Sequence, residues 1–174
     1  MLSELWDTYQ TGLLALVIWR EARGEGEQGM RAVGCSIRNR VDHPAWWGND
    51  YGSVIGKKFQ YSSMAAPGDP QLIRFPGAGD AEFAEALQIA DALVNHEPIA
   101  NPTPCADSFY DTSIPPPAWA TPECYVGTVG RLRFYNVDHD YERVEVPAIV
   151  PVIPMASNTG DVFGAWWRRW KGIT

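Results

Sequence analysis

The N-terminal part of the chain has the hydrophobic pattern of a helix with one buried face. An apolar run, LLALVIW at 13–19, lies between segments rich in polar and charged residues. The pattern predicts a helix that begins at Ser3 or Thr8, continues to Arg23 and stops at Gly24, because glycine is favoured just after a helix C-terminus.

Two further segments have apolar residues at helical spacing. One predicts a helix over 27–41, and the other predicts a helix that begins after the capping residue Asp80. The residues between them, PAWWGNDYG at 44–52 and the polar stretch 54–64, are expected to be loop. The two apolar stripes consist of Met30, Val33, Ile37 and Val41, and of Phe83, Leu87, Ala90 and Val94.

The C-terminal half has a different pattern. Prolines recur in 101–111 and 113–123, which indicates extended segments. Residues 130–137, GRLRFYNV, alternate as a strand does, and 108–110, SFY, is the expected partner strand. Helices followed by a small sheet predict an α+β fold, mainly helical with a small β-ribbon.

The length of 174 residues fits one catalytic domain, expected over residues 1–145. The rest, 146–174, is expected to be an extended segment that wraps the domain, followed by a tail rich in Trp and Arg. In that tail, Trp166 to Lys171 suggest contact with a membrane or lipopolysaccharide, with rings in the interface and cations on phosphates. The alternative is a terminal helix that docks on the domain.

Charge and cysteine content exclude several classes of function. The formal net charge is −7, which argues against a nucleic-acid-binding protein. The three histidines and three cysteines are too scattered for a zinc site, so neither a metal nor a cofactor is expected. Cys35 is expected in the core, whereas Cys105 and Cys124 either form a disulfide or stay reduced.

No targeting or membrane segment is expected from the hydrophobic pattern. The apolar run has seven residues, far fewer than the roughly 20 needed to span a bilayer. Its flanks are acidic, whereas a signal peptide begins with basic residues.

The first helix places two acidic residues within its apolar face. On a wheel of about 100° per residue, with Leu14 at zero, Val17 and Ile18 lie in the apolar arc. Glu21 falls at about 340° and Glu25 at about 20°, inside the same arc. The pattern therefore directs Glu21 to a position where leucine would be expected.

A carboxyl group in such a position is expected to hold its proton near neutral pH. Burial raises its pKa, and so does the negative end of the helix dipole. A proton-holding carboxyl is what a general acid requires. Arg20 and Arg23 would oppose this if they paired with Glu21, but they lie on the side and back of the wheel. The alternative is a structural Glu21 in a salt bridge or accepting backbone hydrogen bonds.

Several short motifs follow one another along the chain. They are EARGE at 21–25 with Gly29, AV at 32–33 and NRV at 39–41, then FQYS at 59–62, SFYD at 108–111, PAW at 117–119 and VGRLRFY at 129–135. In this order they resemble the motifs of the cell wall hydrolase family that includes the spore-cortex-lytic enzymes. The resemblance covers residues 13–136.

The resemblance implies a lysozyme-like fold and cleavage of the glycan strand of peptidoglycan, with Glu21 as the catalytic acid. It implies either the lytic transglycosylase reaction, in which the same Glu then deprotonates the muramyl 6-hydroxyl, or hydrolysis by a muramidase. Hydrolysis needs a positioned water or a second carboxylate about 5–9 Å away, for which Asp50 and Asp111 are candidates. The chain departs from the family at Leu132, where the family has His, and at Asp111, where relatives often carry Asn or His.

Several residues are predicted to contact the substrate. Gln60, Tyr61 and Ser62 are expected to bind acetamido groups or to hold Glu21; as an alternative, Ser62 only starts a turn. Tyr110 and Trp119 either stack on sugar faces or fill the core. Glu25 is predicted to bind substrate, or else to cap the second helix. Trp46 and Trp47 either line a glycan cleft or are buried, whereas Asn39 and Arg40 are expected to be structural.

The small size and the expected lack of an export signal favour a bacteriophage lysin, either an endolysin or a virion-associated protein with virion components as partners. Such a protein would act first from the host cytoplasm and then in the periplasm and cell wall, or from the virion. The rival interpretations are a non-catalytic virion or tail protein that retains the fold to bind glycan, and a wall amidase or peptidase.

Overall fold

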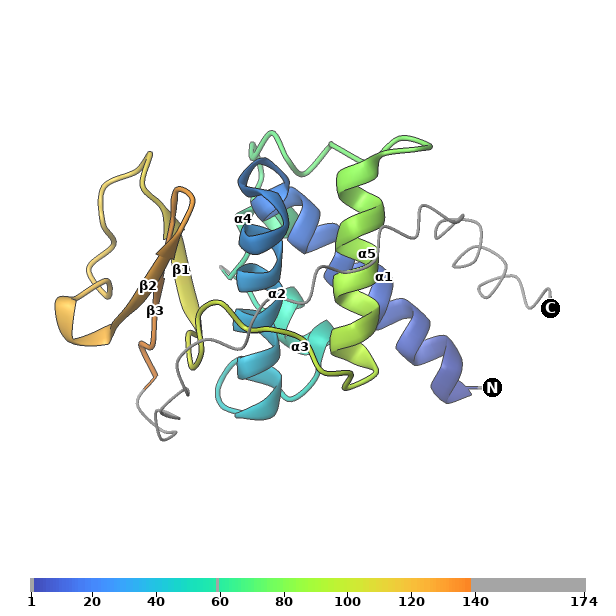
Figure 1. Cartoon of the computed structure of the whole chain (residues 1–174), viewed down its shortest axis with the longest axis horizontal. Helices are drawn as coiled ribbons and strands as arrows, with labels where there is room; N and C mark the ends of the chain where they lie inside the picture. Colours follow the sequence, from blue (N-terminus) through green and yellow to red (C-terminus); the bar gives the residue numbers. More distant parts are fainter. Residues whose placement is uncertain (1, 59, 139–174) are drawn as a thin grey trace.

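The computed structural model describes residues 2–58 and 60–138 and has helices on one side and a small sheet on the other (Figure 1). This arrangement confirms the predicted α+β class. The helices are α1 (Leu2–Ala22), α2 (Gly26–Asp42), α3 (Tyr51–Gly56), α4 (Ser62–Ala65) and α5 (Ala81–Val94), with 3-10 turns η1 (Arg23–Glu25) and η2 (Pro122–Cys124). The strands are β1 (Ser108–Asp111), β2 (Tyr125–Val129) and β3 (Leu132–Tyr135).

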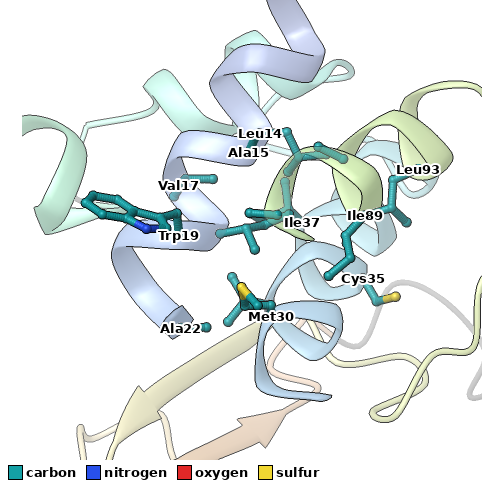
Figure 2. Close-up of a cluster of buried hydrophobic side chains, with 14 of the residues drawn as sticks. Leu14, Ala15, Val17, Trp19, Ala22, Met30, Cys35, Ile37, Ile89 and Leu93 are labelled. Atoms are coloured by element: carbon teal, nitrogen blue, oxygen red, sulfur yellow. The ribbon is translucent and has the colours of Figure 1, made fainter. Parts of the chain in front are cut away.

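The long helices α1, α2 and α5 enclose the hydrophobic core (Figure 2). Leu14 and Ile18 of α1 and Ile37 of α2 are fully buried in it. Gly34 allows α2 to approach α5 closely, because a Cβ at this position would lie 2.8 Å from Leu93 Cδ1 of α5. The predicted helices at 27–41 and after Asp80 are confirmed, and Asp80 accepts a hydrogen bond from the amide of Phe83 as a helix cap.

The sheet is antiparallel with strand order β1-β3-β2 and stands at one end of the molecule, beside α2 (Figure 1). The expected pairing of the SFY segment with 130–137 is confirmed, with Phe109 opposite Phe134. One face of the sheet adds Leu132 and Phe134 to the helical core. The other face carries a separate aromatic cluster.

Some sequence predictions were wrong. α1 ends at Ala22, the 3-10 turn η1 follows, and the glycine with positive φ is Gly26 (φ 67°) rather than Gly24. The region 44–64, expected to be loop, contains the short helices α3 and α4, which are too short for a helical repeat to be visible. Strand β2 also escaped prediction, because it follows a proline-rich stretch and contains Gly127.

Other expectations have mixed outcomes. Trp47 is buried and donates to the carbonyl of Arg40 (2.8 Å), whereas Trp46 is exposed. Cys35 is buried as expected, and Cys105 and Cys124 are free thiols rather than a disulfide. Within 2–58 and 60–138, no helix is long and apolar enough to cross a membrane. The extended segment 146–155 and the Trp166 to Lys171 tail lie outside the described residues.

Candidate active site

Glu21 lies at the C-terminal end of α1 and its carboxylate meets the short helix α4. The hydroxyl of Ser63 donates to Glu21 Oε1 at 2.5 Å. Ser63 is buried, and Glu21 is half-buried. The side chain therefore has one fixed partner, and part of its surface is open to another molecule.

The surroundings of Glu21 favour the protonated carboxyl. Burial raises the pKa of Glu21, the hydrogen bond from Ser63 lowers it, and the negative charge of Asp69 raises it, with a net shift upward from the ordinary value. A carboxyl group whose pKa is raised keeps its proton to a higher pH, which suits it to general acid catalysis.

Neither neighbouring arginine pairs with Glu21. Arg20 is buried and donates to the carbonyl of Ser63 in α4 (2.8 Å). In the segment between α4 and α5 it also donates to the carbonyls of Leu72 (3.1 Å) and Arg74 (2.9 and 3.2 Å). Arg23 donates to Gln71 Oε1 at 2.7 Å. Both guanidiniums therefore hold this segment against the end of α1.

Asp69 is the carboxylate that the structure places near Glu21, and it was not among the predicted candidates. Its Oδ2 accepts from the Ser62 hydroxyl (2.6 Å) and its Oδ1 from the amide of Gln71 (2.8 Å). Adjacent serines at the start of α4 therefore bind different acids, Ser62 binding Asp69 and Ser63 binding Glu21. Of the two serines, Ser63 contacts the predicted catalytic acid.

Gln60 and Tyr61 lie just before these serines. The oxygen Gln60 Oε1 accepts from Arg40 Nη1 (2.5 Å), and Arg40 also donates to the carbonyl of Asp107 (2.5 Å). Arginine has only donors, so the NH2 group of Gln60 must point away from Arg40. Tyr61 is buried; burial raises its pKa, Arg40 lowers it, and the charge of Glu21 raises it further, which places this ring close to the acid.

Arg40 and its neighbour Asn39 are structural, as expected. Asn39 donates to the carbonyl of Ala106 (2.8 Å), and Arg40 joins α2 to the start of β1. Their contacts hold the sheet and the Gln60 segment in one arrangement.

Tyr110 and Trp119 lie in the aromatic cluster on the face of the sheet opposite the helical core. Tyr110 is buried, with its ring centroid 5.9 Å from that of Tyr135 and 6.2 Å from that of Trp119. Trp119 is half-buried. Their packing supports the core alternative for Tyr110, and sugar stacking by either residue stays a prediction.

Glu25 joins η1 to the turn between β2 and β3. Its Oε2 accepts from the amide of Arg131 (2.8 Å) and its Oε1 from Arg131 Nε (2.9 Å). The alternative of a cap on α2 is wrong, because Glu25 makes no side-chain cap hydrogen bond there. Gly130 has φ 57°, and a Cβ on it would lie 2.1 Å from Glu25 Oε2, so this contact requires glycine.

The two candidate second carboxylates have other contacts. Asp50 caps α3 through the amide of Ser53 (2.6 Å), next to Tyr51, whose amide donates to Gln10. Gln10 precedes Glu21 by about 16 Å along α1, so Asp50 lies too far away for that role.

Asp111 accepts from the amide of Ser113 (2.7 Å) and lies 3.7 Å from Arg131 Nη2. Burial raises its pKa, but the bonds from Ser113 and the charge of Arg131 outweigh burial and hold the pKa below its usual range.

Leu132, at the position of the family histidine, is only 2 % exposed and packs in the helical core. This position therefore offers an apolar contact and no titratable group. Within the described part of the chain, no group of three or more His, Cys, Asp or Glu side chains is arranged to hold a metal ion.

Sequence reasoning missed Ser63, Asp69 and the role of Arg20 in binding the α4–α5 segment. The only available signal was the repeated serine of the QYSS stretch, and nothing in the pattern distinguishes Ser62 from Ser63. Contacts between residues 42 or more positions apart decide these roles.

Comparison with known proteins identifies the family. A model of the Cell Wall Hydrolase family matches residues 24–135, from the residue after Arg23 to the end of β3. The match begins three residues after Glu21, so it covers the segments around the acid rather than the acid itself. No curated protein and no solved structure matches the chain. Because the match spans more than half of the chain, the protein belongs to the cell wall hydrolase family.

Proposed function

We propose that this cell wall hydrolase cleaves the glycan strand of peptidoglycan and that Glu21 is its general acid. The observation that carries the proposal is the half-buried Glu21 carboxyl, held by Ser63 at 2.5 Å and with its pKa raised by burial and by Asp69. The lysozyme-like fold implied by the motifs belongs to the same proposal.

The proposed reaction needs one proton donor that later becomes a base. The Glu21 carboxyl gives its proton to the glycosidic oxygen as the C1–O bond breaks. The resulting carboxylate then takes a proton from the nucleophile that attacks C1. If the nucleophile is the muramyl 6-hydroxyl, the product is a 1,6-anhydro end; if it is water, the product is a reducing end.

The route proposed here is that of a lytic transglycosylase, in which Glu21 alone serves first as acid and then as base. Asp69 is the nearby acid, and its oxygens accept hydrogen bonds from Ser62 and from the Gln71 amide. The negative charge of Asp69 raises the pKa of Glu21, which favours the protonated acid.

Gln60 is the substrate contact best supported by geometry. Arg40 occupies its oxygen, so its NH2 group is the part available to a ligand. We propose that this group donates to an acetamido carbonyl of the glycan. Tyr61 and Ser62 contribute by shaping the segment, and Glu25 by holding the β2–β3 turn through Arg131.

The test replaces Glu21 by glutamine and measures clearing of chloroform-treated Gram-negative cells. The glutamine side chain keeps an oxygen that accepts from Ser63, so Glu21→Gln should fold normally and lose several orders of magnitude in rate. Glu85→Gln is the matched control, because burial also raises the pKa of Glu85 although it lies on α5. Clearing by Glu21→Gln at the wild-type rate would remove Glu21 from the mechanism.

Mass spectrometry of the released muropeptides identifies the route. The transglycosylase route gives muramic acid lighter by one water than the hydrolytic product. Binding of glycan without any cleavage products would instead support the non-catalytic tail-protein interpretation. The setting as a phage lysin stays a prediction.

A further inference from the structure

The segment between α4 and α5 presents two large apolar side chains to solvent. Ile73 is 83 % exposed and Phe75 is 69 % exposed. Large apolar side chains left in solvent occur in ligand-binding grooves and at interfaces. Their position matters because this segment is the one that Arg20 and Arg23 bind to the end of α1, beside Glu21.

Phe75 is held in place although it is exposed. The guanidinium carbon of Arg20 lies 5.0 Å from the centroid of its ring, a cation–π contact that covers one face. The preceding carbonyl, that of Arg74, accepts two hydrogen bonds from the same guanidinium. An aromatic ring fixed in this way loses little conformational freedom when a ligand binds.

The same guanidinium connects Phe75 to the acid. Arg20 Nη1 donates to the Ser63 carbonyl at 2.8 Å, and the Ser63 hydroxyl donates to Glu21 at 2.5 Å. One arginine side chain and one serine thus separate the exposed ring from the carboxyl group. By contrast, Tyr9, an exposed aromatic residue of α1, lies about 18 Å along the helix from Glu21.

We propose that Phe75 is a stacking platform for a sugar ring of the glycan strand, next to the bond that Glu21 cleaves. The uncovered ring face would pack against the apolar C–H face of a hexopyranose, while Arg20 supports the covered face. The inference rests on the proposed function, because it requires the ligand to be a glycan.

The test separates binding from cleavage. In the Glu21→Gln background, binding to purified peptidoglycan should fall about tenfold in Phe75→Ala and return in Phe75→Trp, because a stacked ring contributes about 1.4 kcal/mol. In the active enzyme, Phe75→Ala should raise KM by a similar factor and change kcat less. Tyr9→Ala, which removes an exposed aromatic ring distant from Glu21, should leave both constants unchanged.

Wild-type binding and KM in Phe75→Ala would overturn the platform, even if Glu21→Gln has confirmed the acid. The same conclusion would follow if Phe75→Ala lowered the melting temperature more than Tyr9→Ala did but left KM unchanged, because the ring would then be a packing group. If the wild-type protein releases no glycan products and Glu21→Gln does not bind peptidoglycan, the proposed function fails first.

Discussion

At the scale of single residues, three neighbouring effects act on the pKa of Glu21 in opposite directions. Burial and the charge of Asp69 favour the neutral carboxyl, and the Ser63 hydroxyl favours the carboxylate. The balance leaves the pKa raised. A group that must both release and regain a proton works best when neither form is strongly preferred.

The raised pKa of Glu21 predicts a pH dependence of stability. The folded protein binds the Glu21 proton more tightly than the unfolded chain, so this stabilisation is complete below the ordinary pKa of 4.5. It is lost as pH rises through the folded-state pKa. The melting temperature of the wild type should therefore fall relative to Glu21→Gln over that range. A constant difference between the two melting temperatures from pH 4 upward would contradict the shift.

Removal of the Ser63 hydroxyl should move the pH profile. Ser63→Ala deletes the hydrogen bond that lowers the pKa of Glu21, so the pKa should rise further. The loss of kcat/KM at high pH, which follows ionisation of the acid, should then begin at a higher pH than in the wild type. Ser62→Ala, which removes a hydroxyl bound to Asp69 instead, is the matched control. A shift toward lower pH in Ser63→Ala would contradict the assignment.

At Gly130, both the positive φ and the close contact with Glu25 favour glycine over a residue with a side chain. Gly130→Ala would force a side chain into the left-handed region and against Glu25, so it should destabilise the fold by about 2 kcal/mol. Gly77→Ala is the control, because a Cβ at Gly77 meets no atom within 4 Å. Denaturant unfolding measures both; equal midpoints would show that the turn tolerates a side chain.

At the scale of elements, the segment between α4 and α5 has little regular structure of its own, and its position depends on α1. Arg20 holds this segment by donating to the carbonyls of Leu72 and Arg74, and it also donates to the carbonyl of Ser63 in α4. Because Arg20 precedes Glu21 directly, the end of α1 positions both the acid and the segment that carries Phe75 (Figure 1).

Limited trypsin digestion tests this connection. Arg20→Lys keeps the charge but cannot reproduce the planar set of donors, so the segment should detach more often and cleavage after Arg74 should accelerate. The expected loss of stability is about 2 kcal/mol. Arg38→Lys is the control. Arg38 also donates to a carbonyl, that of Leu93, but it does not contact the α4–α5 segment. Equal cleavage rates after Arg74 in the two variants would contradict the role of Arg20.

At the scale of the whole molecule, side-chain hydrogen bonds join three units: the helical core, the α4–α5 segment and the sheet. Arg40 and Asn39 join the core to the start of β1, and Glu25 joins η1 to the β2–β3 turn. The family match over residues 24–135 includes the sheet, the α4–α5 segment and the core helices α2 and α5, whereas α1 lies just before it.

This arrangement predicts that the chain truncated after residue 145 keeps its fold and its activity. Its melting temperature and rate of wall clearing should match those of the full chain, because the core described for residues 2–138 and the Glu21 contacts need no later residue. Sedimentation with anionic vesicles should fall if residues Trp166 to Lys171 bind membranes. Loss of folding in the truncated chain would show that the C-terminal residues belong to the domain.

The sequence by itself determined the elements whose pattern is local and repeats over many residues. The helices at 26–42 and 81–94, the pairing of β1 with β3, and the apolar arc that directs Glu21 toward other side chains are set by periodicity and caps. Only the tertiary structure decided that Ser63 rather than Ser62 binds Glu21, that Asp69 rather than Asp50 or Asp111 is the nearby acid, and that Arg20 is buried. These features depend on contacts between residues 42 to 54 positions apart, which hydrophobic spacing along one helix does not encode.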